Sequence, residues 1–280
     1  MAVPGRADSA GSGRSSNQPR PDFTGREKSL FRSAAITTLA GLIAGFVVGG
    51  IGSRVAMRIV AVVAGPSADG RITQFGAVVG HLTPQGTLFL MFLGAMLGIP
   101  PAIFYMAVRR WIPSAPTKGL TFGAILLLIL GSVFIEASNP DFARFGPRLL
   151  NMILFATLPI VYGLLLVKLV GRFERTFPAV SRKITVLVPY AVLSILFFIG
   201  LALAFTVRSF SSSGPSLSII TLIFLAPMAY RLFVLSIAAN SNMFRHRYVL
   251  YGGYTVLAIS CIIGFTQLSR AIYQILSAVV

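Results

Sequence analysis

Acidic residues are scarce in this sequence of 280 residues, which holds seven Asp and Glu against 24 Lys and Arg. Charged residues of both signs make up 11% of the chain, whereas soluble domains carry about 25%. So few charges cannot cover a globular surface with groups that interact favourably with water. The composition therefore excludes an ordinary soluble domain.

Cysteine and histidine are almost absent as well. The single cysteine, Cys261, lies inside an apolar segment, so the chain cannot form an internal disulfide. The two histidines, His81 and His246, fall in different loops and cannot supply a His/Cys-rich metal cluster. We expect neither a metal nor a cofactor.

The sequence also lacks the common enzyme signatures. It contains no G-x-S-x-G, no H-E-x-x-H, no P-loop and no pair of membrane-embedded aspartates. The seventh apolar segment has no lysine, which excludes a retinal Schiff base there. We therefore expect a protein that is not an enzyme.

Long apolar segments are what the chain does have, since 55% of its residues are hydrophobic. The segments are about 16 to 20 residues long, near the length that crosses a ~30 Å hydrocarbon core as a helix. This pattern predicts an all-α, polytopic transmembrane bundle of seven spans. The predicted spans are 34–52, 87–107, 120–137, 149–168, 186–206, 216–235 and 248–266.

The distribution of basic residues predicts the orientation. The segment before the first span and those after the second, fourth and sixth spans hold 17 of the 24 Lys and Arg. Loops enriched in Lys and Arg stay on the cytoplasmic side, so we expect a cytoplasmic N-terminus and an outside C-terminus in the cell membrane. The net charge of +17 then indicates contact with anionic lipid head groups rather than with nucleic acid.

The N-terminal segment 1–32 is rich in Gly, Ser, Pro and Arg and almost free of apolar residues. Such a segment cannot bury enough surface to offset its ordering entropy, so we expect it to be a disordered, basic, cytoplasmic tail. An organellar transit peptide is the alternative, although acidic residues and prolines argue against an amphipathic helix. Residues 33–280 are predicted to form a single transmembrane domain.

Small residues recur every four positions in the first apolar segment. Gly41, Gly45, Gly49 and Ser53 would share one face of an α-helix, with Gly50 off that face. Small residues let membrane helices approach backbone to backbone, so this face predicts a packing seam. Its partner is either another span of the same chain or a second copy in a homodimer.

Two arginines follow the seam, Arg54 and Arg58, and the apolar pattern then resumes to residue 64. Residues 34–64 therefore form either one over-long tilted helix or a span followed by a helix in the interface. Arginines on the outer side oppose the general charge bias and need partners. A candidate polar cluster comprises Arg54, Arg58, Glu136, Asp141 and Arg144.

This cluster has three interpretations. It is a structural Arg–Glu pair joining the outer ends of spans 1 and 3, a site for an ion or anionic ligand, or a solvated loop. Carboxylates at the membrane boundary are uncommon enough that each is a functional candidate.

The segments GLIAGFVVGGIGSRVAMRIVAVVAG (41–65) and NPDFARFGPRLLN (139–151) resemble a pattern in uncharacterised multi-pass membrane proteins of bacteria. The resemblance covers roughly residues 40–170 and implies a bacterial inner membrane, with no function attached.

Two functions follow as hypotheses. The first is a non-enzymatic interaction, accessory or scaffold protein that binds another membrane protein or itself. The second is a small-solute or ion transporter or channel that uses the outer Arg/Glu cluster. Mid-span polar residues are few and neutral, which weighs against transport.

Overall fold

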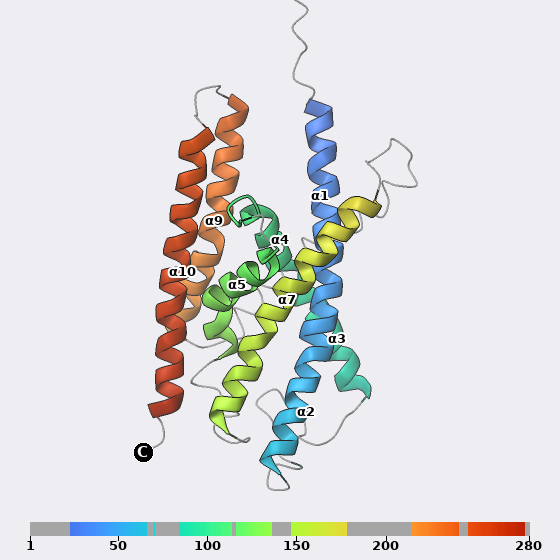
Figure 1. Cartoon of the computed structure of the whole chain (residues 1–280), viewed down its shortest axis with the longest axis vertical. Coiled ribbons are helices and arrows are strands. Elements are labelled where there is room, and N and C mark those ends of the chain that lie inside the picture. Colours follow the sequence, from blue (N-terminus) through green and yellow to red (C-terminus); the bar gives the residue numbers. More distant parts are fainter. Residues whose placement is uncertain are drawn as a thin grey trace, which may run out of the picture.

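The computed structural model describes residues 23–65, 70, 84–113, 116–135, 147–177, 214–240 and 246–277 (Figure 1). Every element of regular structure in these ranges is a helix, which confirms the all-α expectation for this part of the chain. In chain order they are α1 (Phe23–Ala44), the π-helix η1 (Gly45–Gly52), α2 (Ser53–Ala64), α3 (Pro84–Leu97), α4 (Ile99–Val108), α5 (Lys118–Phe134), α7 (Arg148–Thr176), α9 (Gly214–Asn240) and α10 (His246–Ser277).

Four helical stretches are long and apolar enough to cross a membrane, and two shorter ones are equally apolar. The long stretches are Arg32–Ala64, Pro84–Val108, Arg148–Thr176 and Leu250–Ser277, and the shorter ones are Lys118–Phe134 and Thr221–Phe233. These six positions overlap six of the seven predicted spans. The other predicted span, 186–206, lies outside the described residues.

The first helix begins earlier than the sequence predicted. Helix α1 starts at Phe23, inside the segment 1–32 that was expected to be disordered. Its first turns contain Arg26, Glu27, Lys28 and Leu30, which all have high helix propensity. Composition alone undervalued that propensity, because a polar segment joined to a membrane helix can extend it. Residues 1–22 lie outside the described part of the chain.

Helices α1, η1 and α2 form one continuous helix, so the over-long helix is the arrangement observed of the two predicted. The junction residues Gly52 and Ser53 keep right-handed helical φ/ψ angles of −59°/−42° and −64°/−36°. The 33 residues Arg32–Ala64 extend about 50 Å at 1.5 Å per residue, more than the ~30 Å of hydrocarbon. The helix ends at Gly65, whose φ of 72° suits glycine.

The predicted glycine face packs against α3 of the same chain. A Cβ added to Gly45 would meet the Gly94 carbonyl oxygen and lie 2.8 Å from the Gly98 Cα. A Cβ on Gly49 would lie 3.0 Å from the Gly94 Cα, and one on Gly41 would lie 2.6 Å from the Ala102 Cβ. The two backbones therefore touch where glycines meet glycines.

The expectation that Gly50 lies off this face is wrong. A Cβ on Gly50 would lie 2.7 Å from the Met91 Cα. The reason is that residues 45–52 form a π-helix, in which bonds run from residue i to i+5. Positions i+4 and i+5 then lie on either side of position i, so Gly49 and Gly50 both face α3 when Gly45 does.

Ser53, the last residue of the predicted seam, forms hydrogen bonds at the end of the π-helix. Its hydroxyl donates to the carbonyl oxygens of Gly49 at 2.5 Å and of Gly50 at 3.0 Å. These carbonyls lie where the hydrogen-bond ladder returns from i→i+5 to i→i+4, and a serine hydroxyl supplies the local donor. The side chain is buried, which is consistent with this local bond.

The second span is broken at Gly98, between α3 and α4. Pro100 and Pro101 follow immediately, and proline removes the N–H that an uninterrupted helix needs. The Gly98 carbonyl accepts a hydrogen bond from the buried hydroxyl of Tyr162 on α7 at 2.5 Å. This bond ties α7 to the second span at the level of the break.

A second glycine seam joins α5 to α7. A Cβ on Gly123 would lie 2.6 Å from the Ile160 Cα, and one on Gly119 would lie 2.9 Å from the Leu164 Cα. Across the seam, Gly163 faces the backbone of Gly123. Sequence reasoning missed this seam, although Gly119 and Gly123 show the same four-residue spacing.

Aromatic rings from α4, α5 and α9 pack against one another in the core of the described helices. The Phe104 ring stacks on Phe224 at 4.8 Å and on Phe122 at 6.3 Å between centroids. Tyr105 meets Phe122 edge-on at 4.9 Å. Phe104 and Phe122 are completely buried, so large side chains from α4, α5 and α9 form a packed aromatic layer among the described helices.

Helices α4, α7 and α9 run in one direction, and the start of α1 and the end of α10 lie at opposite ends of the bundle (Figure 1). The directions follow from pairs of contacting residues along each helix. These pairs are Tyr162 with Gly98, Glu174 with Arg109, Phe224 with Phe104 and Tyr230 with Trp111. The end of α7 and the start of α9 therefore lie at opposite ends of the bundle.

The glycine seam generates a test with a matched control. Gly45→Ala places a methyl group against the backbone of α3, so it should destabilise the protein by about 1–3 kcal/mol through overpacking. Gly171→Ala on α7 has no atom within 4 Å of the new methyl group, so it should be neutral or slightly stabilising. The measurement is the midpoint of thermal unfolding in detergent. Equal midpoints for the two variants would contradict the seam.

Candidate functional site

Two of the five residues of the predicted outer polar cluster lie within the described part of the chain. Arg54 and Arg58 lie on α2, whereas Glu136, Asp141 and Arg144 lie outside the described residues. Pairing between these arginines and carboxylates therefore stays a prediction. Arg58 is exposed and Arg54 is half-buried.

One atom of this cluster is informative. The Arg54 Nε is buried and has no hydrogen-bond partner within the described residues. A buried guanidinium N–H without an acceptor is costly, so such groups in folded proteins almost always have one. Arg54 is accordingly the better candidate of the two arginines for an acceptor in this region.

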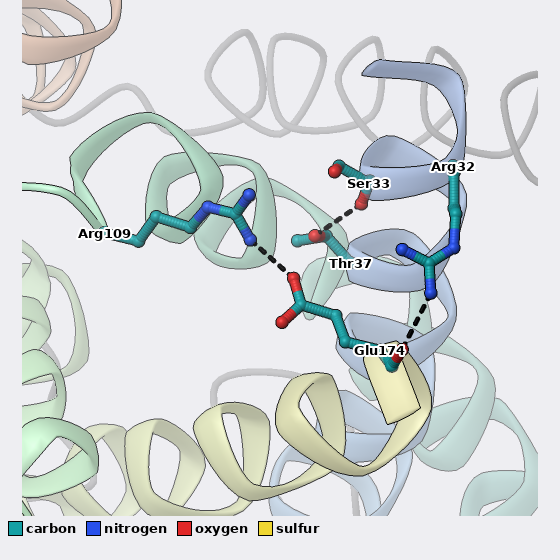
Figure 2. Close-up of polar contacts among 5 residues, drawn as sticks. All are labelled: Arg32, Ser33, Thr37, Arg109 and Glu174. Atoms are coloured by element: carbon teal, nitrogen blue, oxygen red, sulfur yellow. Dashed lines mark hydrogen bonds and ion pairs between the residues drawn. The ribbon is translucent and has the colours of Figure 1, made fainter. Parts of the chain in front are cut away.

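Charged side chains also meet at the other end of the bundle, where the turn of α1 that carries Arg32 lies beside the end of α7 and Arg109 (Figure 2). Arg109, which follows α4, donates from Nη1 to the Glu174 Oε1 at 2.7 Å. The two side chains are 31% and 39% exposed, so solvent weakens this pair. It joins the end of the second span to the end of α7.

Arg32 binds the same end of α7 through backbone atoms. Its Nη2 donates to the carbonyl oxygens of Glu174 and Phe177, both at 2.7 Å. The last carbonyls of a helix have no partner within the helix and carry its partial negative charge, which a cation satisfies. Arg32 therefore caps α7 and fixes α1 against it, as Figure 2 shows.

A cavity of about 430 Å³ opens beside this ion pair. Cationic side chains, one carboxylate, a phenol ring and an apolar strip of α7 form its wall. The lining residues are Tyr105, Arg109, Arg110, Lys118, Val167, Val170, Gly171 and Glu174. Its volume lies within the range of roughly 300–1,000 Å³ that small-molecule sites have.

The charge of the lining is positive. Arg109, Arg110 and Lys118 contribute three cations, and Glu174 contributes the one anion. The Lys118 Nζ lies 5.9 Å from the centre of the Tyr105 ring, at the outer limit of a cation–π contact. This basic cavity is defined by its eight lining residues and has the electrostatics of an anion site.

Sequence reasoning saw these residues without seeing the cavity. The basic residues at 107–119 and 168–185 entered the orientation argument as counts, which say nothing about side-chain contacts. The available signal was Glu174, one of only seven acids and placed among basic residues near the end of a span. The argument from the small number of acidic residues was applied only to the carboxylates predicted on the outer side.

The described residues contain no group of three or more His, Cys, Asp or Glu side chains that could hold a metal ion. No protein-family model, curated protein or solved structure matches the chain. The assignment of a function therefore rests on the fold and on the geometry of these two ends.

The Arg109–Glu174 pair generates a prediction about salt. Glu174→Gln removes the charge but keeps the backbone carbonyl that Arg32 binds, so it should cost at most about 1 kcal/mol at low salt. At 1 M NaCl, where the Debye length is about 3 Å, that cost should disappear. Thermal unfolding at both salt concentrations measures it. A large cost that persists at high salt would show that the pair is not a screened surface bridge.

Proposed function

We propose that this protein is a non-enzymatic membrane protein that acts through interactions, as an accessory or scaffold subunit in the cell membrane. The observation that carries the proposal is the buried aromatic layer, in which the Phe104 ring stacks on the rings of Phe122 and Phe224. Backbone-to-backbone seams add rigidity around this core. A rigid bundle with a filled centre is suited to presenting surfaces.

The surfaces of the bundle support the same proposal. Large apolar side chains on α3 and α10 are exposed, among them Leu88 and Phe92 on α3 and Ile262 and Phe265 on α10. In a membrane these faces contact lipid tails or the helices of another protein. Exposed aromatic residues on α10, such as Tyr254 and Tyr273, provide contact area for a partner.

The proposed topology has seven spans, a cytoplasmic N-terminus and an outside C-terminus. Six described helices traverse the bundle, and α7 and α9 run in the same direction. The sequence between α7 and α9 contains the apolar segment 186–206. One membrane crossing by this segment makes the number of spans odd. The basic end of the bundle, with Arg32, Arg109 and Lys118, is then the cytoplasmic end, as the charge bias requires.

Reporter fusions test this topology. A reporter active only in the cytoplasm should score at 113–117 and 176–180, because both positions follow the basic end of the bundle. It should be silent at 212–214 and after Val280. A cytoplasmic signal at Val280 would contradict the seven-span arrangement.

Transport through the outer Arg/Glu cluster is the second candidate function. The buried Arg54 Nε without a hydrogen-bond partner in the described part of the chain favours it, since ligand sites expose such donors to an anion. The bundle would then admit a small solute from the outer side. The filled aromatic layer opposes a continuous path and makes transport the weaker candidate.

One pair of measurements separates the two functions. A photo-crosslinking residue at Phe92 or Ile262 should trap a discrete protein adduct in cells, whereas one at the buried Phe104 should trap none. Purified protein in liposomes should give no solute or ion flux above that of empty liposomes. A flux that Glu136→Gln abolishes while the protein keeps its thermal midpoint would overturn the accessory role in favour of transport.

A further inference from the structure

We propose that the basic cavity between α4, α5 and α7 binds an anionic phosphate group, with the head group of an anionic membrane lipid as its source. The inference goes beyond the accessory role and does not depend on it. It needs only that the bundle lies in a membrane, with this cavity at one of its two surfaces.

The position of the cavity points to the membrane surface. Arg109 and Arg110 come directly after the apolar stretch Pro84–Val108, and Lys118 is the first residue of the apolar helix α5. Glu174 lies within the last turn of α7. The end of the α4 stretch, the start of α5 and the last turn of α7 thus bring charged groups to one cavity, at the level where lipid phosphates lie.

The chemistry of the wall fits an amphiphile with a phosphate. Arg110 is exposed and Lys118 half-buried, and neither forms an ion pair within the described residues. Both cations are therefore available to a phosphate, and Arg109 uses only one of its five N–H donors on Glu174. Val167 and Val170 give the cavity an apolar part of its wall, which suits the glycerol end of a lipid.

The lining is also held in place before any ligand arrives. Arg109 is fixed by Glu174, and α7 is capped by Arg32. Positioned cations lose less entropy on binding than free ones, so preorganisation should add affinity. A cavity of this kind distinguishes a phosphate site from the diffuse attraction between any basic loop and an anionic surface.

The test measures lipid affinity of the detergent-solubilised full chain by native mass spectrometry. The probes are phosphatidylglycerol, phosphatidylcholine and inorganic phosphate. Phosphatidylglycerol should bind more tightly than phosphatidylcholine, whose choline cation opposes the basic wall. The double variant Arg110→Gln/Lys118→Gln should lower the phosphatidylglycerol affinity about 25-fold, or about fivefold per charge removed.

The matched control removes the same number of charges from the same end of the bundle. Arg172 and Arg175 are exposed on α7 and do not line the cavity. The variant Arg172→Gln/Arg175→Gln should therefore keep most of the affinity. If it loses as much as the cavity variant, the attraction is diffuse and the proposal is overturned.

A variant that is expected to raise the lipid affinity separates loss of the site from loss of folding. Glu174→Gln removes the one anion among the described lining residues, and its amide oxygen can still accept a hydrogen bond from Arg109 and keep that side chain in place. The variant should therefore tighten phosphatidylglycerol binding about fivefold. Unchanged or weaker binding in this variant would contradict the site. Equal binding of the two lipids, with no binding of inorganic phosphate, would contradict it as well.

Inorganic phosphate decides the source of the ligand. Binding of phosphate alone, lost in Arg110→Gln/Lys118→Gln, would keep the anion site but replace the lipid by a free phosphate. No binding of phosphate, together with tight phosphatidylglycerol binding, would establish the lipid as the source. Neither result depends on the crosslinking and flux measurements, so the site and the accessory role stand or fall separately.

Discussion

The backbones of η1 and α3 touch at Gly45, Gly49 and Gly94. The rest of the fold depends on this contact. Lipid tails are as apolar as leucine, so membrane helices gain little from burying side chains and much from backbone contact. The contact sets the position of α3, and the broken α3–α4 pair then presents the Gly98 carbonyl to Tyr162. One seam thereby positions the first two spans and α7 together.

The seams and the aromatic core complement each other. Glycines draw η1 to α3 and α5 to α7 with almost no space between them, and bulky rings from α4, α5 and α9 meet on the bundle axis. Interiors pack at the density of organic crystals, so thin seams must be balanced by large side chains elsewhere. This balance leaves a packed aromatic layer between α4, α5 and α9, and the proposed interaction role rests on that layer.

The length of the apolar segments predicted the six described spans, and four-residue spacing predicted the glycine face, because both signals are local in the sequence. The four-residue spacing could not predict that Gly50 faces α3. That spacing assumes an α-helix, whereas residues 45–52 form a π-helix with a longer period. The partner of the seam was also hidden, because four-residue spacing names a face but not what lies opposite. The Arg109–Glu174 pair joins residues 65 positions apart, a separation that no local pattern encodes. The carboxylates of the predicted outer cluster fall outside the described residues.

At the basic end of the bundle, the C-terminal end of α7 binds two arginines that come from neighbouring segments. Arg32 binds the terminal carbonyls of α7, and Glu174 on that last turn holds Arg109. Each bond orients a cation that would otherwise sample many rotamers, and the uncommitted cations Arg110 and Lys118 border the same cavity. With one carboxylate against three cations, the cavity keeps a positive potential even after its internal pair has formed. The structural bonds that join α1, α4 and α7 therefore also create the conditions for binding an anion.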